Sequence, residues 1–278
     1  MKAVKVAVTI IVVLASAGCL GHLRNAKGAF TEAQELGRSY QTEASIAAYK
    51  RARAEAELES RSRPSAQAFT IKGMAEVNLG LWKDAEASFV KAFGLGFESG
   101  EEWAADVSLL GLAVSFEELG FRDQAFRVYE NLTAKSRFKP VKLAAAGRYI
   151  GLGLARALVL GDAEKKRALA ALLTSIDRLE TADFASGAYH YYHAQVESHR
   201  GDWRRSYEEA VMARELGLPS EKILRDNDNQ IVFCYDRLTE ALPAAERGVF
   251  EAAHAGWTKK WQWADARTPA WKKAPSKE

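Results

Sequence analysis

The chain has 278 residues, of which 48% are hydrophobic, 27% are charged and only six are proline, and its formal net charge is +3. This length and apolar content are sufficient for a buried core, and so small a net charge gives no reason to expect a nucleic-acid partner. Alanine, leucine and charged residues dominate, which favours helices over strands.

Residues 1–18 predict a signal peptide. Lys2 and Lys5 supply a positive start, and residues 6–17 form an uncharged apolar run. This run is too short to cross a bilayer, which takes about 20 apolar residues in a helix. The pattern is typical of a segment that directs export and is then removed.

Two cleavage positions compete at the end of this segment. Residues 16–19, Ser-Ala-Gly-Cys, resemble a bacterial lipobox, which implies cleavage before Cys19 and acylation of that cysteine, with palmitate among the chains. Alternatively, the Ala-Ser-Ala of residues 15–17 fits an ordinary signal-peptidase site and would release a secreted or periplasmic chain. In the lipoprotein interpretation, residues 19–27 are a tether on the periplasmic side of a membrane. Because Leu20 rather than Asp follows the cysteine, the outer membrane is favoured in a Gram-negative cell.

Four glycines mark an internal repeat. Gly80, Gly120, Gly161 and Gly201 are spaced 40, 41 and 40 residues apart, and each lies between two helical-looking segments. Glycine tolerates the left-handed backbone that commonly ends a helix, so the spacing predicts a series of helical hairpins. Small and aromatic residues recur in the same register: Ala85, Ala125 and Ser206 stand five residues after their glycines, and Phe89 and Tyr129 stand nine after, with Tyr49 one period earlier.

The residues Gly73, Gly80, Ala85, Phe89 and Ala92 resemble the pattern of the tetratricopeptide-repeat family, in which small residues let two antiparallel helices approach closely. Related patterns surround Gly120 and Gly201, whereas the repeat around Gly161 is degenerate, with Lys166 at a small-residue position. The resemblance covers roughly residues 26–257. The period of 40 exceeds the family's value of about 34 and predicts longer connections between hairpins.

The resemblance implies an all-α fold, a right-handed superhelical solenoid of about six antiparallel helix pairs over residues 28–257. The first pair is expected at residues 28–38 and 44–58, and the last at 229–242 and 244–257. Stacked neighbours are required because no single hairpin buries its own apolar face.

In such a solenoid the first helix of each pair lines a concave groove. The register places a mixed polar and aromatic set of side chains there, which we expect to bind a protein or peptide partner: Arg148, Tyr191, Gln195, His199, Glu117 and Glu118. The sequence has no glycine-rich phosphate loop and no G-x-S-x-G motif, so we expect no enzyme activity and no cofactor. The alternative is a solute-binding accessory lipoprotein that holds a small ligand for a transporter.

Three further features have ordinary structural interpretations beside functional ones. His190, His193 and Glu197 share a helix face and could offer metal ligands, but packing or surface histidines are favoured and no metal is expected. Cys234 lies in an apolar stretch and is expected to be a buried thiol. Residues 258–278 form a tail rich in tryptophan and lysine, expected to be partly disordered, which either caps the last hairpin or contacts a membrane.

Overall fold

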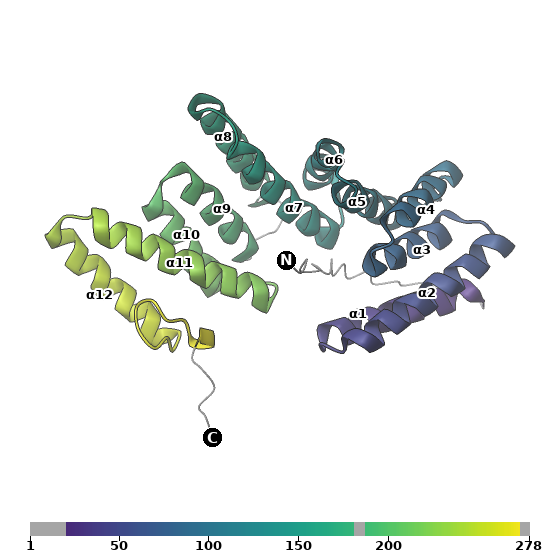
Figure 1. Cartoon of the computed structure of the whole chain (residues 1–278), viewed down its shortest axis with the longest axis horizontal. Helices are drawn as coiled ribbons and strands as arrows, with labels where there is room; N and C mark the ends of the chain where they lie inside the picture. Colours follow the sequence, from purple (N-terminus) through teal and green to yellow (C-terminus); the bar gives the residue numbers. More distant parts are fainter. Residues whose placement is uncertain (1–20, 181–186, 273–278) are drawn as a thin grey trace, which may run out of the picture. The chain divides into compact units, whose positions relative to one another are not determined.

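The computed structural model describes residues 21–180 and 187–272, so the signal-peptide prediction for residues 1–18 and the predicted acylation of Cys19 lie outside the described residues. The described residues are all-α, and consecutive helices are antiparallel neighbours along much of the chain (Figure 1). Their twelve α-helices are α1 His22–Arg38, α2 Thr42–Ser62, α3 Ala66–Leu79, α4 Trp82–Leu95, α5 Glu102–Glu118, α6 Arg122–Lys135, α7 Lys139–Ala157, α8 Asp162–Glu180, α9 Gly187–Arg200, α10 Trp203–Leu216, α11 Glu221–Ala241 and α12 Ala244–Lys260.

The chain divides into two compact units, with the boundary between Leu152 and Gly153 inside α7. In the first unit each helix from α1 to α5 packs on the next, and the first helices of successive hairpins also touch, α1 with α3 and α3 with α5. In the second unit α8 to α12 pack in chain order, and α9 also touches α11. Each unit therefore places first helices beside one another.

The repeat glycines form the predicted turns in three of four hairpins. Gly80, Gly120 and Gly201 have φ angles of 74°, 92° and 83°, and each directly follows or closely follows the end of a first helix. Gly161 is not in the left-handed region, so the prediction is wrong there. The reason is local: α7 already ends at Ala157, and the next three residues complete the turn.

The aromatic residue of the best-matching repeat shows why two nearby helix positions are glycine. Phe89 on α4 is fully buried. A β-carbon added at Gly73 on α3 would lie 2.7 Å from its ring, and one added at Gly111 on α5 would overlap the ring. One phenyl ring thus fills the space among three helices, and two glycines make that space.

The second unit ends in a cap formed by the tail. Trp263 is 7% exposed and packs in an apolar cluster with Tyr207 of α10 and Tyr235 of α11. Further along, a 3₁₀ turn at Ala270–Lys272 carries Trp271, whose indole N–H donates to Asp228 at 3.0 Å. The structure thus places the described part of the tail against α10 and α11, and residues 273–278 lie outside the described residues.

Two helices begin earlier than the sequence pattern suggested. Helix α1 starts at His22, whose ring Nδ1 lies 2.6 Å from a carboxylate oxygen of Glu55 on α2. Helix α11 starts at Glu221, where the hydroxyl of Ser220 accepts from the N–H of Ile223 and caps the helix. None of the described helices combines the length and apolar character needed to span a bilayer.

Candidate binding surface

The six side chains expected to bind a partner fall into two groups, one in each unit. In the first unit, the Arg148 guanidinium on α7 lies 2.7 Å from a carboxylate oxygen of Glu117 on α5. The hydroxyl of Tyr129 on α6 donates to the same oxygen at 2.9 Å. Glu118 is exposed. The structure thus brings Glu117 and Arg148 together, and the Glu117 carboxylate links α5, α6 and α7.

Burial shapes the electrostatics of this group. Tyr129 has no exposed surface, and burial raises the pKa of its hydroxyl well above its ordinary range. Arg148 and Glu117 keep 18% and 23% of their side chains exposed, so the ion pair is reachable from solvent at its edge. A buried neutral donor on one side of the carboxylate and a guanidinium on the other fix the position of Glu117.

In the second unit, Tyr191, Gln195 and His199 follow one another at intervals of four on α9 and are all half-buried. The Nδ1–H of His199 donates to the backbone carbonyl of Gln195 at 2.8 Å, which sets the tautomer of the ring. Burial raises the pKa of the Tyr191 hydroxyl, and the nearby carboxylate of Asp226 on α11 raises it further. Tyr191 is therefore a neutral hydrogen-bonding group.

A chain of hydrogen bonds joins this row to α11 and α10. The side-chain amide of Gln195 donates to Gln230 on α11 at 3.4 Å, and that of Gln230 donates to the Ser206 hydroxyl on α10 at 3.1 Å. Ser206 donates in turn to the carbonyl of Ala194 at 2.8 Å. We call Tyr191, Gln195, His199 and Gln230 the α9–α11 face.

The start of α9 is fixed by a close backbone approach. A β-carbon at Gly187 would overlap the carbonyl oxygens of Ala213, in the last turn of α10, and of Gly217, directly after that helix. Only glycine allows these two backbone segments to come so near. This contact holds α9 on α10 at the end opposite to the turn at Gly201.

Two histidines on the other side of α9 contact a carboxylate of α10. His190 Nδ1 lies 2.6 Å from one oxygen of Glu209, and the Nδ1 of buried His193 lies 3.6 Å from the other. Glu197 does not join them, because both of its oxygens accept from Arg200, at 3.0 and 2.9 Å. Among the residues that the structure describes, no group of three or more His, Cys, Asp or Glu side chains is placed to hold a metal ion.

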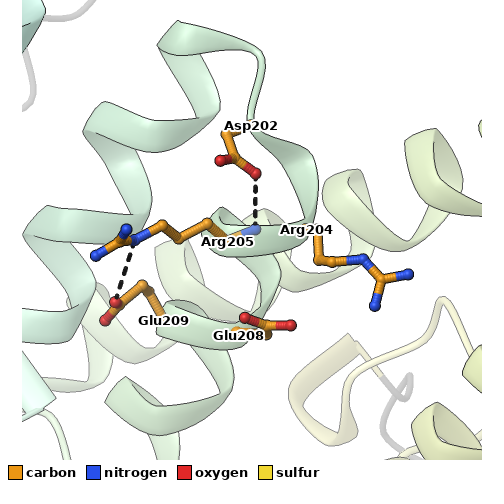
Figure 2. Close-up of a pocket in the computed structure, with 5 residues that line it drawn as sticks. All are labelled: Asp202, Arg204, Arg205, Glu208 and Glu209. Atoms are coloured by element: carbon orange, nitrogen blue, oxygen red, sulfur yellow. Dashed lines mark hydrogen bonds and ion pairs between the residues drawn. The ribbon is translucent and has the colours of Figure 1, made fainter.

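Figure 2 shows the surface hollow beside this pair, about 410 Å³ in volume. Its walls are charged and come from the turn before α10 and the first half of that helix: Asp202, Arg204, Arg205, Glu208 and Glu209. Arg205 reaches across it, with its backbone N–H on Asp202 at 3.0 Å and its Nε 3.9 Å from Glu209. Opposite charges thus already compensate one another within the hollow.

A second hollow of about 510 Å³ lies where α10 meets α11 and the tail. Its lining includes Leu218, Leu224 and the indole of Trp261, together with Arg214 and two carboxylates. Arg214 is nearly buried, forms an ion pair with Asp228 and lies 4.8 Å from the centre of the Trp261 ring. The lining of this second hollow therefore mixes apolar and charged side chains and does not form an apolar cavity.

Gln230 and Tyr129 are the site residues that the sequence did not place in the binding surface. No glycine follows α11 to carry the repeat register beyond Gly201, so nothing in the sequence aligned Gln230 with the earlier first helices. Tyr129 was recognised as a packing aromatic. Its hydroxyl contact with Glu117 depends on the twelve-residue separation across a hairpin, which recurs between Ser88 and Glu76.

Comparison of the chain with protein-family models, with curated proteins and with solved structures gives no match. The class is therefore defined by the structure alone, as an all-α protein of helices packed neighbour on neighbour, compatible with a helical-repeat fold.

Proposed function

We propose that the chain is a non-catalytic adaptor of the tetratricopeptide-repeat type, built as a right-handed solenoid of six helix pairs. An acyl group on Cys19 anchors it on the periplasmic side of a membrane, the outer membrane in a Gram-negative cell. Its first-helix surfaces bind an extended segment or a helix of another envelope protein. The hairpins, their left-handed glycines and the buried small residues support the repeat type.

The α9–α11 face is the observation that carries the proposal. Four polar or aromatic side chains lie on two adjacent first helices, and all remain partly accessible to solvent. Hydrogen bonds already hold Gln195, Gln230 and His199, so less side-chain entropy is lost when a partner binds. Tyr191 adds an amphipathic ring, the kind of side chain that contributes strongly at protein interfaces.

The chemistry of this face favours a polypeptide over a charged polymer. Its groups are amides, a phenol and an imidazole, which donate to and accept from backbone amides. No formal charge is needed for such contacts. Within the first unit, the exposed edge of the Glu117–Arg148 pair offers a charged contact of its own.

Crosslinking and pull-down of the tagged full-length protein from its native envelope tests the proposal. A Tyr191→Ala, His199→Ala double variant removes two side chains of the α9–α11 face. The matched control is a Glu208→Ala, Met212→Ala double variant on α10, where both side chains are exposed. The proposal expects one dominant protein partner, lost in the first variant and kept in the control. Capture that is equal in both variants would contradict it.

The solute-binding alternative would use the hollow between α10 and α11. Its volume of about 510 Å³ is in the range of small-ligand sites, and Trp261 and Leu224 supply apolar contact. The charged groups in its lining weigh against an apolar solute. Ligand-induced thermal stabilisation of the purified protein that is abolished by Leu224→Arg would move support to this function.

A further inference from the structure

We propose that the tip of the α7–α8 hairpin inserts into the interface of an anionic lipid membrane, through the apolar side chains of residues 158–160. We call residues 158–160 the apolar tip. This contact goes beyond the adaptor function and is separate from the acyl anchor proposed at Cys19.

The apolar tip is the most exposed run of large apolar residues that the structure describes. Leu158, Val159 and Leu160 are 57%, 84% and 39% exposed. The turns at the other repeat glycines offer less apolar surface. Leu81 is 36% exposed, and Phe121 is half-exposed but packs edge-on against Phe116.

The repeat register shows that this apolar surface is specific to one hairpin. Val159 occupies the position that holds Asn78, Glu118 and His199 in other first helices. The other three hairpins carry polar side chains at this position, whereas the α7–α8 hairpin exposes a valine. Packing within the described residues gives no reason for this difference, because the side chain has almost no protein neighbours.

The backbone holds the tip in place. The amide of Leu158 donates to the carbonyl of Leu154 at 3.1 Å, and those of Val159 and Leu160 donate to Arg156 and Ala157, each at 3.3 Å. The tip is therefore a hydrogen-bonded extension of α7. Its three backbone N–H groups all have partners, which lowers the cost of moving them out of water.

Cationic side chains flank the tip along the chain. Lys165, Lys166 and Arg167 lie in the first turns of α8, and Arg156 lies in the last turn of α7. Asp162 and Glu164 are the acidic residues of this stretch, so residues 156–167 carry a net charge of 4 − 2 = +2. Anionic lipid headgroups attract such a cluster, and the apolar side chains enter the interface beneath them.

Lys166 links the charge to the degenerate repeat. Its register position holds Ala85, Ala125 and Ser206 in three other hairpins, and all three are buried. In α8 the lysine is exposed. The same hairpin thus departs from the repeat pattern twice, with an exposed apolar tip and an exposed cation, and both departures suit a lipid surface.

The test places an environment-sensitive fluorescent amino acid at position 159 of the full-length protein. Val249 on α12, a valine that is 73% exposed, is the matched control position. The protein is added to vesicles of phosphatidylcholine and phosphatidylglycerol that contain a spin-labelled lipid. Emission at position 159 should shift to the blue and be quenched, whereas emission at position 249 should not change. Because the readout is local, an acyl anchor alone does not produce this difference.

A Lys166→Glu, Arg167→Glu double variant, with its fold checked by circular dichroism, should lower the quenching at position 159 several-fold. Vesicles of phosphatidylcholine alone should do the same. A probe at position 159 that stays in water while the chain is vesicle-bound would overturn the proposal, as would equal quenching at both positions or no vesicle binding. No protein partner is present, so failure of the adaptor proposal leaves this experiment unaffected.

Discussion

Phe89 on α4 packs so closely on Gly111 of α5 that a β-carbon at position 111 would overlap the ring. The contact joins one hairpin to the next, and it depends on a missing side chain. A buried aromatic residue of one repeat thus needs a glycine in its neighbour.

Replacing Gly111 with alanine should therefore destabilise the first unit. Phe89 is fully buried and cannot turn into solvent, so overpacking should lower the free energy of unfolding by about 1–3 kcal/mol. Gly94→Ala on α4 is the control, because its β-carbon meets nothing within 4 Å. This control should be neutral or stabilise by up to about 1 kcal/mol. Urea unfolding followed by circular dichroism measures both, and equal effects would contradict the packing account.

The turn glycines should differ in their tolerance of alanine. Gly80 has a φ of 74°, where a β-carbon costs about 1–2 kcal/mol, so Gly80→Ala should lower the unfolding midpoint. Gly161 has no left-handed φ and open space around it, so Gly161→Ala should have little effect. Both sites are exposed or half-exposed in turns, which makes them comparable. A Gly161→Ala variant as unstable as Gly80→Ala would show that the turns are alike after all.

Arg148 and Tyr129 should act on stability together, because both bind the same oxygen of Glu117. Arg148→Met and Tyr129→Phe should each cost about 1 kcal/mol, since the ion pair is partly exposed. A double-mutant cycle should give a coupling of at least about 0.5 kcal/mol. Arg51→Met, which breaks an exposed pair with Glu32, should cause no measurable change. Strict additivity would show that the three groups do not form one unit.

Stability should fall in mild acid because of His254. Its ring Nδ1 accepts from Tyr207 at 2.8 Å and its Nε2–H donates to the carbonyl of Ala266 at 2.9 Å, and burial lowers its pKa below the ordinary 6.5. As the pH falls through 6.5, the unfolded chain binds a proton that the folded chain does not. The free energy of unfolding should then decrease, by at most about 1.4 kcal/mol per pH unit, and level off below the folded pKa.

The His254→Gln variant isolates this contribution. The glutamine amide can still donate to Ala266, but it does not titrate. Unfolding midpoints measured between pH 7.5 and pH 5 should slope less in the variant than in the unmodified protein. The other four histidines are present in both proteins and cancel in the comparison. An unchanged slope would assign the acid sensitivity to another group.

The repeat spacing predicted the hairpins well, because glycine backbone and small-residue packing are local requirements. Gly80, Gly120 and Gly201 form the expected turns. Gly161 does not, since α7 ends at Ala157, four residues before the glycine, and spacing alone carries no information on where a helix ends.

The candidate site was predicted less completely. The register found Tyr191, Gln195 and His199 on one face, because a period of four is a property of any helix. It did not find Gln230, which reaches the same face from α11 through a contact over 35 residues. It also treated Glu117 and Arg148 as separate partner contacts, whereas their 31-residue separation closes into an ion pair. Such contacts depend on the packing of whole helices, which no single window of sequence contains.

The most direct test of the adaptor account is a photocrosslinking amino acid at position 195 of the protein in living cells, with position 212 on α10 as the comparison. The account predicts that position 195 yields one crosslinked envelope protein and that position 212 yields none. The absence of any protein adduct at position 195, or the same adducts from both positions, would contradict it.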